Sequence, residues 1–216
     1  MTPASVLTNC RAQLYETTAT YWTDAELYGY MWYGERELAQ LVPCTEAAFL
    51  TATVTDTSGY TSPSDILYYD RVTYDSVKLK RVDQTDVDAL NRRGYGASST
   101  TGQPTHYYEY GKMVYVWPIP QEAADLKFWY FSEPAEVTAA ATDFTVPSMF
   151  QSYLQDYVLY RAWAKDDNEG KANFFRQQWE NDKQLAYNNW AQRGQRDGYR
   201  VVRDVDNYPE TQLGMI

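Results

Sequence analysis

Cysteine and histidine are nearly missing from this chain. Cys10 and Cys44 are the only cysteines among 216 residues, and His106 is the single histidine. Two cysteines are too few for a disulfide framework, and one histidine leaves no ligand set for a structural zinc. The sequence therefore predicts no metal site and no cofactor, and we expect synthesis in a reducing cytoplasm.

Positive charge is also scarce over most of the chain, and the formal net charge is −10. Residues 1–160 carry 10 basic and 20 acidic side chains, whereas residues 161–203 carry 9 basic and 6 acidic ones. Neutralisation of phosphates supplies most non-specific affinity for DNA, so this chain is not expected to coat itself with DNA. An acidic surface that lies near DNA without binding it remains compatible with the composition.

Long hydrophobic runs are absent as well. Nowhere do roughly 18 apolar residues follow one another, as a membrane-spanning helix requires. The first residues, MTPASVLTNCRAQL, lack the basic start and apolar stretch of a signal peptide. We expect a soluble protein made inside a cell, with a length that suits one domain with an inserted lobe or two small domains.

Aromatic residues, by contrast, are abundant. They make up 16% of the chain, with 21 tyrosines and 7 tryptophans, which is more than one core of this size needs. Tyrosine and tryptophan are enriched at interfaces because they bury a large area and keep a polar tip. The excess favours contact with other protein chains; a tyrosine-rich core and strand surface, or rings that stack on sugars, are the alternatives.

The N-terminal part predicts two helices. The first starts at Pro3 and ends near the threonine-rich run at Thr17–Thr20. Thr23 and Glu26 form a capping-box pattern that opens the second helix, which Pro43 closes. Residues 1–43 are therefore predicted to be a helical hairpin.

The middle part, residues 44–145, is predicted to be an inserted antiparallel β domain. Cys44–Asp65 suggests a loop or irregular strand, and Asn91–Gln103 a flexible loop. Gly111-Lys112 is a two-residue connection that suits a tight hairpin. The strand candidates are Ile66–Val72, Val77–Val82, Thr105–Tyr110, Met113–Trp117 and Leu126–Phe131.

The C-terminal part predicts two more helices, in residues 146–193, that complete a helical bundle. The first enters at Pro147 and has an aromatic face, and the second starts after a cap at Asn168 and ends before Gly194. Its apolar stripe consists of Ala172, Phe175, Trp179, Ala186 and Trp190. Residues 194–216 look extended, and we expect this tail to dock on a neighbour or to be disordered.

The candidate catalytic groups each have a simpler structural explanation. Glu35 and Glu37 lie two apart on a helix and point in different directions, so they cannot flank one glycosidic bond and are expected on a solvated face. His106 has no nucleophile motif near it. Asp83, Asp86 and Asp88 do not follow the spacing of a calcium-binding loop, and Gly94-Tyr-Gly96 is not a dinucleotide fingerprint. We therefore predict a protein that is not an enzyme.

A basic cluster recurs near the C-terminus, and it consists of Arg193, Arg196, Arg200 and Arg203. Aspartates at 197, 204 and 206 interleave these arginines, so an acidic protein partner is a better match than nucleic acid. A solvated tail is the other interpretation.

The order of these parts resembles the head-to-tail adaptors of tailed phages, known in short-tailed phages as tail tubular or tail accessory factor proteins. The helix WTDAELYGYMWYGERELAQLVP is followed by a sheet region, by HYYEYGKMVYVWPIP, by LKFWYFSEP, by TDFTVPSMF and by the helix LQDYVLYRAWAKDD. VWPIP and DYVLYRAWAKDD, in that order and spacing, are the more specific motifs.

The resemblance implies a structural virion protein, assembled in the host cytoplasm, that forms a ring, usually a dodecamer. It implies a helical part against the portal protein and a β part toward the tail nozzle or tail tube. Genomic DNA would pass through the lumen without sequence-specific binding, and no membrane is involved. A carbohydrate-binding β module and a head-completion protein at another level of the neck are the alternative functions.

We thus expect an α+β fold: a helical bundle from the N- and C-terminal helices, an inserted small antiparallel β domain and an extended C-terminal tail. The residues expected to contact other proteins are aromatic, aliphatic or basic. They are Trp22, Tyr30, Trp32, Tyr33, Tyr107, Tyr110, Arg193, Arg196, Tyr199, Arg200, Val201, Val202 and Arg203.

Overall fold

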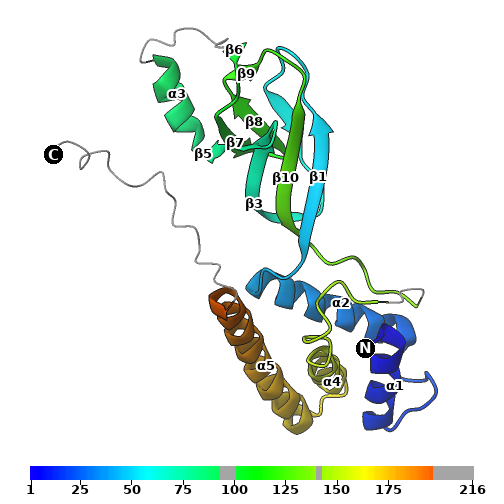
Figure 1. The fold of residues 1–216 in the computed structure, drawn as a ribbon. Helices are drawn as coiled ribbons and strands as arrows, with labels where there is room; N and C mark the ends of the chain where they lie inside the picture. Colours follow the sequence, from blue (N-terminus) through cyan, green and yellow to red (C-terminus); the bar gives the residue numbers. More distant parts are fainter. Residues whose placement is uncertain (93–100, 140–142, 197–216) are drawn as a thin grey trace, which may run out of the picture. The chain divides into compact units, whose positions relative to one another are not determined.

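The computed structural model describes residues 1–92, 101–139 and 143–196. Helices and sheets both contribute to it, which confirms the predicted α+β class (Figure 1). The chain separates into two compact units. The helical unit contains Met1–Gly34, Val137–Phe144 and the chain from Ser148 onward, and the β unit contains Glu35–Glu136 and Thr145–Pro147.

The elements are labelled in chain order in Figure 1. The helices are α1 (Pro3–Gln13), α2 (Asp24–Leu41), α3 (Gln84–Arg92), α4 (Leu154–Lys165) and α5 (Glu169–Arg196). The strands are β1 (Glu46–Ala52), β2 (Gly59–Thr61), β3 (Ile66–Tyr74), β4 (Val77–Lys78), β5 (Lys80–Arg81), β6 (Thr101–Gly102), β7 (His106–Tyr110), β8 (Met113–Trp117), β9 (Ile119–Pro120) and β10 (Asp125–Ser132). Helix α2 passes from the helical unit into the β unit after Gly34.

Local capping bonds explain where the helices begin. The Ser5 amide donates to the Thr2 hydroxyl at 3.2 Å and the Thr2 amide to the Ser5 hydroxyl at 3.0 Å, with Pro3 in the first turn of α1. The Glu26 amide donates to the Thr23 hydroxyl at the start of α2. Asn168 caps α5 through the Lys171 amide, as the sequence predicts.

The helical unit is held by a core of apolar side chains from α1, α2, α4 and α5. Tyr157 of α4 meets Trp179 of α5 edge to face, with ring centroids 5.0 Å apart. A Cβ added to Gly34 would lie 3.1 Å from Tyr157 and 3.2 Å from Leu154, so glycine permits the close approach of α2 to α4. The buried residues include Val6, Cys10, Leu14, Leu27, Met31, Phe150, Leu154, Val158, Ala162, Trp179 and Ala186.

The β unit contains two four-stranded sheets, in the strand orders β1-β10-β3-β4 and β2-β8-β7-β5. Most pairs are antiparallel, but β5 pairs with β7 in parallel, as does β6 with β9. Alternate residues of β8 and β10 are buried, which is the pattern of a sheet with one face on a core. One buried cluster takes side chains from both sheets: Tyr60, Val72, Tyr74, Leu79, Tyr107, Val114, Val116, Leu126, Phe128 and Tyr130.

The predicted hairpin at Gly111-Lys112 is confirmed. Strands β7 and β8 are antiparallel, with Tyr110 opposite Met113. Gly111 has φ +63°, a backbone conformation that glycine adopts without strain.

Several predicted boundaries are wrong. The region expected to be a loop or irregular strand contains β1 and β2, and residues with no predicted element form α3. Residues 148–153 form turns, and α4 begins only at Leu154, because the backbone bonds there join residues three apart, such as Tyr153 N–H to Phe150 C=O. Helix α1 ends at Gln13, and α5 continues through the glycine that was expected to end it.

Candidate interaction surfaces

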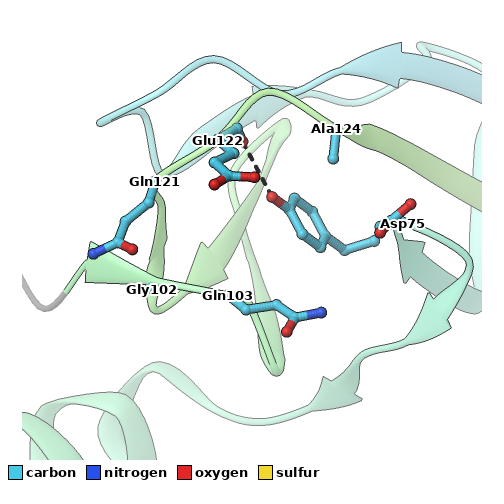
Figure 2. Close-up of a pocket in the computed structure, with 7 residues that line it drawn as sticks. Asp75, Gly102, Gln103, Gln121, Glu122 and Ala124 are labelled. Carbon is cyan, nitrogen blue, oxygen red and sulfur yellow. Dashed lines mark hydrogen bonds between the residues drawn. The ribbon is translucent and has the colours of Figure 1, made fainter.

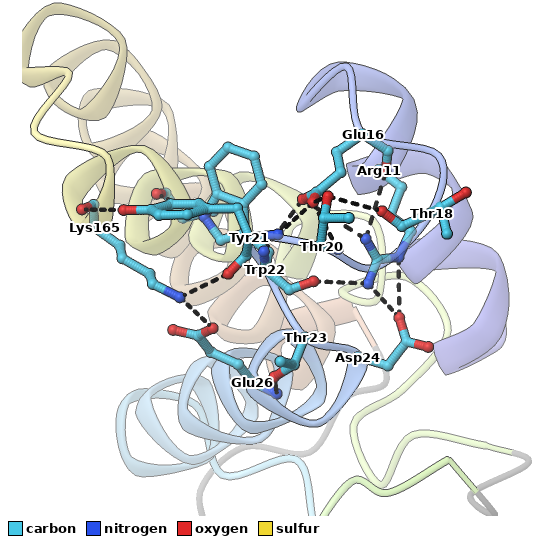
Figure 3. A network of polar contacts seen from close by, with 11 residues as sticks. Arg11, Glu16, Thr18, Thr20, Tyr21, Trp22, Thr23, Asp24, Glu26 and Lys165 are labelled. Atoms are coloured by element: carbon cyan, nitrogen blue, oxygen red, sulfur yellow. Dashed lines mark hydrogen bonds and ion pairs between the residues drawn. The ribbon is translucent and has the colours of Figure 1, made fainter.

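A buried arginine ties the end of α1 to the start of α2 (Figure 3). The Arg11 Nε atom donates to the Asp24 carboxylate at 3.0 Å, and Nη2 donates to the Trp22 carbonyl oxygen at 3.0 Å. Nη1 lies 3.9 Å from the Glu16 carboxylate. Because Arg11 is buried with its guanidinium in contact with two carboxylates, the connection between the two helices has one defined conformation.

Glu16 organises the same connection from the other side. Its carboxylate accepts a bond from the Thr20 hydroxyl and bonds from the backbone amides of Thr20, Tyr21 and Trp22. The Thr20 hydroxyl and these amides stabilise the ionised form and lower the pKa of Glu16 to about 2. The connection is therefore a folded turn that carries a persistent negative charge.

Tyr21 and Trp22 dock this turn on the C-terminal end of α4. The Trp22 indole donates to the Ala162 carbonyl oxygen at 3.1 Å, and the Tyr21 hydroxyl donates to the Lys165 carbonyl oxygen at 3.1 Å. Both carbonyls belong to the last turn of α4, where helix carbonyls often lack intrahelical partners. The Ala162 oxygen also accepts from the Asp166 amide at 3.3 Å. Trp22 is buried, so its ring packs within the chain.

A second polar group joins α2 to α4. The Glu26 carboxylate accepts from the Tyr30 hydroxyl at 2.8 Å and from the Lys165 ammonium at 2.7 Å. Burial raises the pKa of Glu26, but the bonds from Lys165 and Tyr30 outweigh it and the pKa is lowered. Arg161 also lies 5.7 Å from the centre of the Tyr30 ring. The Tyr30 side chain thus contacts Glu26 and Arg161 within the helical unit, and only part of it is accessible to another protein.

Trp32 and Tyr33 form the exposed aromatic part of α2. Their ring centroids lie 5.3 Å apart, and Tyr33 is 46% exposed while Trp32 is half-buried. Of the four aromatic candidates in the N-terminal part, Tyr33 has the most accessible ring.

The two aromatic candidates in the β unit differ from each other. Tyr107 is buried in the core between the sheets, and burial raises its pKa to about 12. Tyr110 is 65% exposed beside the hairpin turn. Between them, Tyr108 of β7 stacks on Tyr115 of β8 with centroids 5.1 Å apart. The hairpin therefore has an aromatic outer surface, of which Tyr110 is the accessible end.

The remaining candidates lie at or beyond the end of the described chain. Arg193 and Arg196 belong to α5, and nothing is described of their side chains. Tyr199, Arg200, Val201, Val202 and Arg203 lie outside the described residues.

Glu35 is a residue whose position the sequence did not reveal. The expectation of a solvated face is wrong for it, because its side chain is fully buried in the β unit. One carboxylate oxygen accepts from the Val146 amide at 3.0 Å, and the other has no hydrogen-bond partner among the described residues. Burial raises the pKa of Glu35 to about 7 although the Val146 and Thr145 amides lower it.

An acidic pair, Asp156 and Asp182, joins α4 to α5. Burial raises the pKa of Asp156, and burial together with the hydrogen bond and charge of Asp156 raises the pKa of Asp182 to about 7. The two carboxyl groups share a hydrogen bond, which needs a proton on one of them.

Strand β1 forms an open edge of its sheet. It pairs with β10 along its whole length, from Glu46 opposite Phe131 to Ala52 opposite Asp125, and no strand of the described chain pairs with its other side. Phe49 is 39% exposed and Leu50 is 56% exposed. The sequence does not indicate this surface, because the alanine-rich segment lacks a strong strand pattern.

Two concave sites have volumes of about 300 Å³ each. The one in the β unit is lined mainly by polar side chains, and the Tyr74 hydroxyl there donates to the Glu122 carbonyl oxygen at 3.1 Å (Figure 2). The one in the helical unit is aromatic, with the Lys171 ammonium 3.7 Å from the centre of the Trp163 ring. Its lining consists of Gln13, Tyr15, Trp163, Lys171, Phe174 and Phe175.

The described residues contain no group of three or more histidine, cysteine, aspartate or glutamate side chains placed to hold a metal ion. Among the same residues, no helix has the length and apolar character needed to cross a membrane.

These features define a two-unit α+β protein whose accessible aromatic rings and open strand edge are those of a protein that binds other proteins. The family model described as SU10 adaptor protein matches residues 1–204, and the chain belongs to this family. The resemblance to phage head-to-tail adaptors is thereby confirmed. A comparison with curated proteins gives no match.

Family membership makes the chain a phage adaptor protein and a component of the virion. The family is a structural class of protein and not a class of enzymes. It also implies interaction with portal and tail proteins.

Proposed function

We propose that this protein forms a ring, with twelve subunits as in the adaptors that it resembles, that joins the portal to the tail. The observation that carries the proposal is the match of the SU10 adaptor family to residues 1–204, which include both units. The genome would pass through the lumen of the ring during ejection, and the ring would assemble in the host cytoplasm.

We also propose a division of labour along the chain. Residues 1–43 and 146–193 would form the helical part that meets the portal, and residues 44–145 the β part that meets the tail nozzle or tail tube. Residues 194–216 would reach a neighbouring subunit or the portal. The arginines from Arg193 to Arg203 support this role, because they are suited to an acidic protein surface.

The charge of the chain supports passage of DNA without binding. Residues 1–160 have twice as many acidic as basic side chains, so a lumen formed by them repels phosphate. The accessible aromatic residues Tyr33 and Tyr110 supply area for protein contacts.

The experiment that tests the proposal is the mass of the purified full chain, alone and mixed with the portal protein of the same phage. Native mass spectrometry should detect a complex in which several copies of the chain bind one portal ring. A chain whose mass never changes in the presence of portal would contradict the proposal.

A pair of exposed tyrosines provides matched variants for the same experiment. Tyr33→Ser should weaken portal binding at least tenfold, because its ring is a contact candidate. Tyr15→Ser is the control, because Tyr15 is even more exposed than Tyr33 but is not a contact candidate. This variant should bind the portal as the unchanged chain does. Equal binding by both variants would remove Tyr33 from the contact surface.

A further inference from the structure

We propose that the open edge of β1 is the docking site for residues 199–205 of a second copy of this chain, which add a strand to the sheet. The tail of one subunit would thereby be joined to the β unit of the next. This inference rests on the proposed ring, and it adds the site at which neighbouring subunits meet.

The first argument is the contrast between β1 and the other edges of the two sheets. The strands at the other ends of the two sheets are only two or three residues long, and β4 and β5 carry Lys78, Lys80 and Arg81. Because β4 pairs only with Thr73 and Tyr74, β3 also has no strand partner beside Ile66–Arg71 among the described residues, but this stretch carries the charges of Asp70 and Arg71. Short length and lysine are common protections against unwanted strand pairing. Strand β1 has seven residues, contains no lysine or proline, and has a single charge, at Glu46. Strand β1 therefore lacks these protections, as expected of an edge that pairs with another strand in the assembled ring.

The second argument is the direction of its backbone groups. The Ser132 amide donates to the Thr45 carbonyl oxygen, and the Thr53 amide donates to the Ala124 carbonyl oxygen. In an antiparallel pair these bonds occur at every second residue, so the odd-numbered residues face β10. The amides and carbonyls of the even-numbered residues point away from the sheet; these residues are Glu46, Ala48, Leu50 and Ala52.

The third argument is the apolar surface on both faces of β1. Phe49 stacks on buried Phe128, with centroids 6.0 Å apart, while Leu50 lies on the opposite face. A strand that covers both needs two adjacent apolar residues, because neighbours in a strand point to opposite faces. Val201 and Val202 are such a pair.

The chain itself supplies few candidates for the occupant. The ranges outside the described residues are 93–100, 140–142 and 197–216. The second is too short to pair with seven residues, and the first, RGYGASST, contains two glycines. The segment YRVVRDV at 199–205 has the valines and tyrosine that strands favour, and Gly198 precedes it. Residues 197–206 can extend over about 33 Å, which is enough to reach beyond their own subunit.

Ring symmetry favours binding of β1 to the tail of another copy over binding of β1 to β1 of another copy. If β1 paired with β1 of a second copy, the contact would be two-fold and would close on two subunits. A ring needs two different patches on each subunit, and a tail that binds a strand edge provides them.

Cysteine cross-linking in the full chain tests the site directly. Leu50→Cys is combined with Val201→Cys or with Val202→Cys, and the protein is assembled with portal and oxidised. Cys10 and Cys44 are buried, and burial raises their pKa to about 12 and about 11, so they contribute little background. We expect a ladder of covalently linked chains from one of the two pairs and not from the other, because the two valines face opposite ways.

Each other outcome contradicts the inference in a recognisable way. A link within one chain would show that the tail binds its own subunit, and a dimer from Leu50→Cys alone would show that two β1 edges pair. Rings that form without either link would refute the docking site and leave the adaptor function intact. If the unchanged chain forms no ring with portal, the proposed function fails first and the docking site fails with it.

A proline variant provides a second measurement. Leu50→Pro removes an amide that points away from the sheet and keeps the bonds to β10, since proline is tolerated on the free side of an edge strand. Leu50→Val, which retains that amide, is the matched control. Ring formation should fall at least tenfold in Leu50→Pro, with an unchanged circular dichroism spectrum, and stay normal in Leu50→Val. Normal rings from a folded Leu50→Pro variant would overturn the proposal.

Discussion

The two units of this protein differ in whether the backbone hydrogen-bonding groups at helix ends and sheet edges have partners within the chain. In the helical unit, side chains of the same chain close the helix ends: Trp22 and Tyr21 bind the last carbonyls of α4, and Asn168 caps α5. In the β unit, no strand of the described chain pairs with the outer side of β1 along its seven residues. The difference matters for binding, because the backbone groups of β1 can pair with an added strand, whereas the ends of α4 and α5 already have partners within the chain.

The largest effect is expected in the core behind the open edge. Phe128→Ala should lower the free energy of unfolding by about 4 kcal/mol, because Phe128 is fully buried and a cavity remains. Denaturant unfolding measures the effect. Phe174→Ala on α5 is the control, since Phe174 is more than half exposed and should change stability by less than about 0.5 kcal/mol. Equal effects would mean that the β unit lacks the tight core described for it.

The next effect concerns Glu35. Its pKa is about 7 in the folded chain and 4.5 in the reference state, so the folded chain keeps a proton that the unfolded chain loses. The free energy of unfolding should therefore fall as pH rises from about 4.5 through 7, by about 3 kcal/mol in total. Glu35→Gln should remove the contribution of Glu35 to this fall, leave that of Asp182, and stabilise the protein at pH 8, as urea unfolding at several pH values would show.

Glu37→Gln is the control for that measurement, because Glu37 lies two residues further along α2. The fall in stability that belongs to Glu35 should persist in this variant. If the Glu35 variant keeps the slope of the original chain, Glu35 ionises normally in the folded state.

A smaller loss is expected where α2 approaches α4. Gly34→Ala should destabilise the helical unit by about 2 kcal/mol, because the new methyl group meets Tyr157 and Leu154 at 3.1–3.2 Å. Gly29→Ala on the same helix meets nothing within 4 Å and should stabilise by about 0.5–1 kcal/mol. Thermal unfolding of the two variants should move in opposite directions. A gain in both would show that α2 and α4 have room to separate.

The smallest effect concerns the acidic pair between α4 and α5. Asp182→Asn keeps a hydrogen-bonding group next to Asp156 and removes one charge. The raised pKa of Asp182, about 7, means that its ionisation destabilises the folded chain as pH rises through 7. The variant should gain about 1–2 kcal/mol at pH 8, after allowance for partial exposure, and nothing at pH 4. A gain that is equal at both values would point to packing and not to charge.

The helical unit was easier to predict than the β unit for a physical reason. Caps at Thr2, Thr23 and Asn168 are local signals, and the stripe on α5 places Trp179 in the core as predicted. Strand β1 has no such signal, because its alanines have low strand propensity and it exists through its pairing with β10.

The contact surfaces were harder to predict, because the sequence shows residue types but not burial. The aromatic side chains of Trp22 and Tyr107 predict contact residues, but both rings are buried within the chain. Tyr33 and Tyr110 are accessible, and their role in binding stays a prediction. Glu35 is predicted to lie on a solvated face because the local sequence does not show its partner. That partner, the Val146 amide, lies more than a hundred positions away along the chain.

The connectivity of the two units has a mechanical consequence. The chain passes between them at residues 34/35, 136/137, 144/145 and 147/148. Tension applied to the β unit is therefore divided among several peptide connections that act in parallel. One cleaved connection leaves the units covalently joined, which would suit the proposed role of linking the portal to the tail.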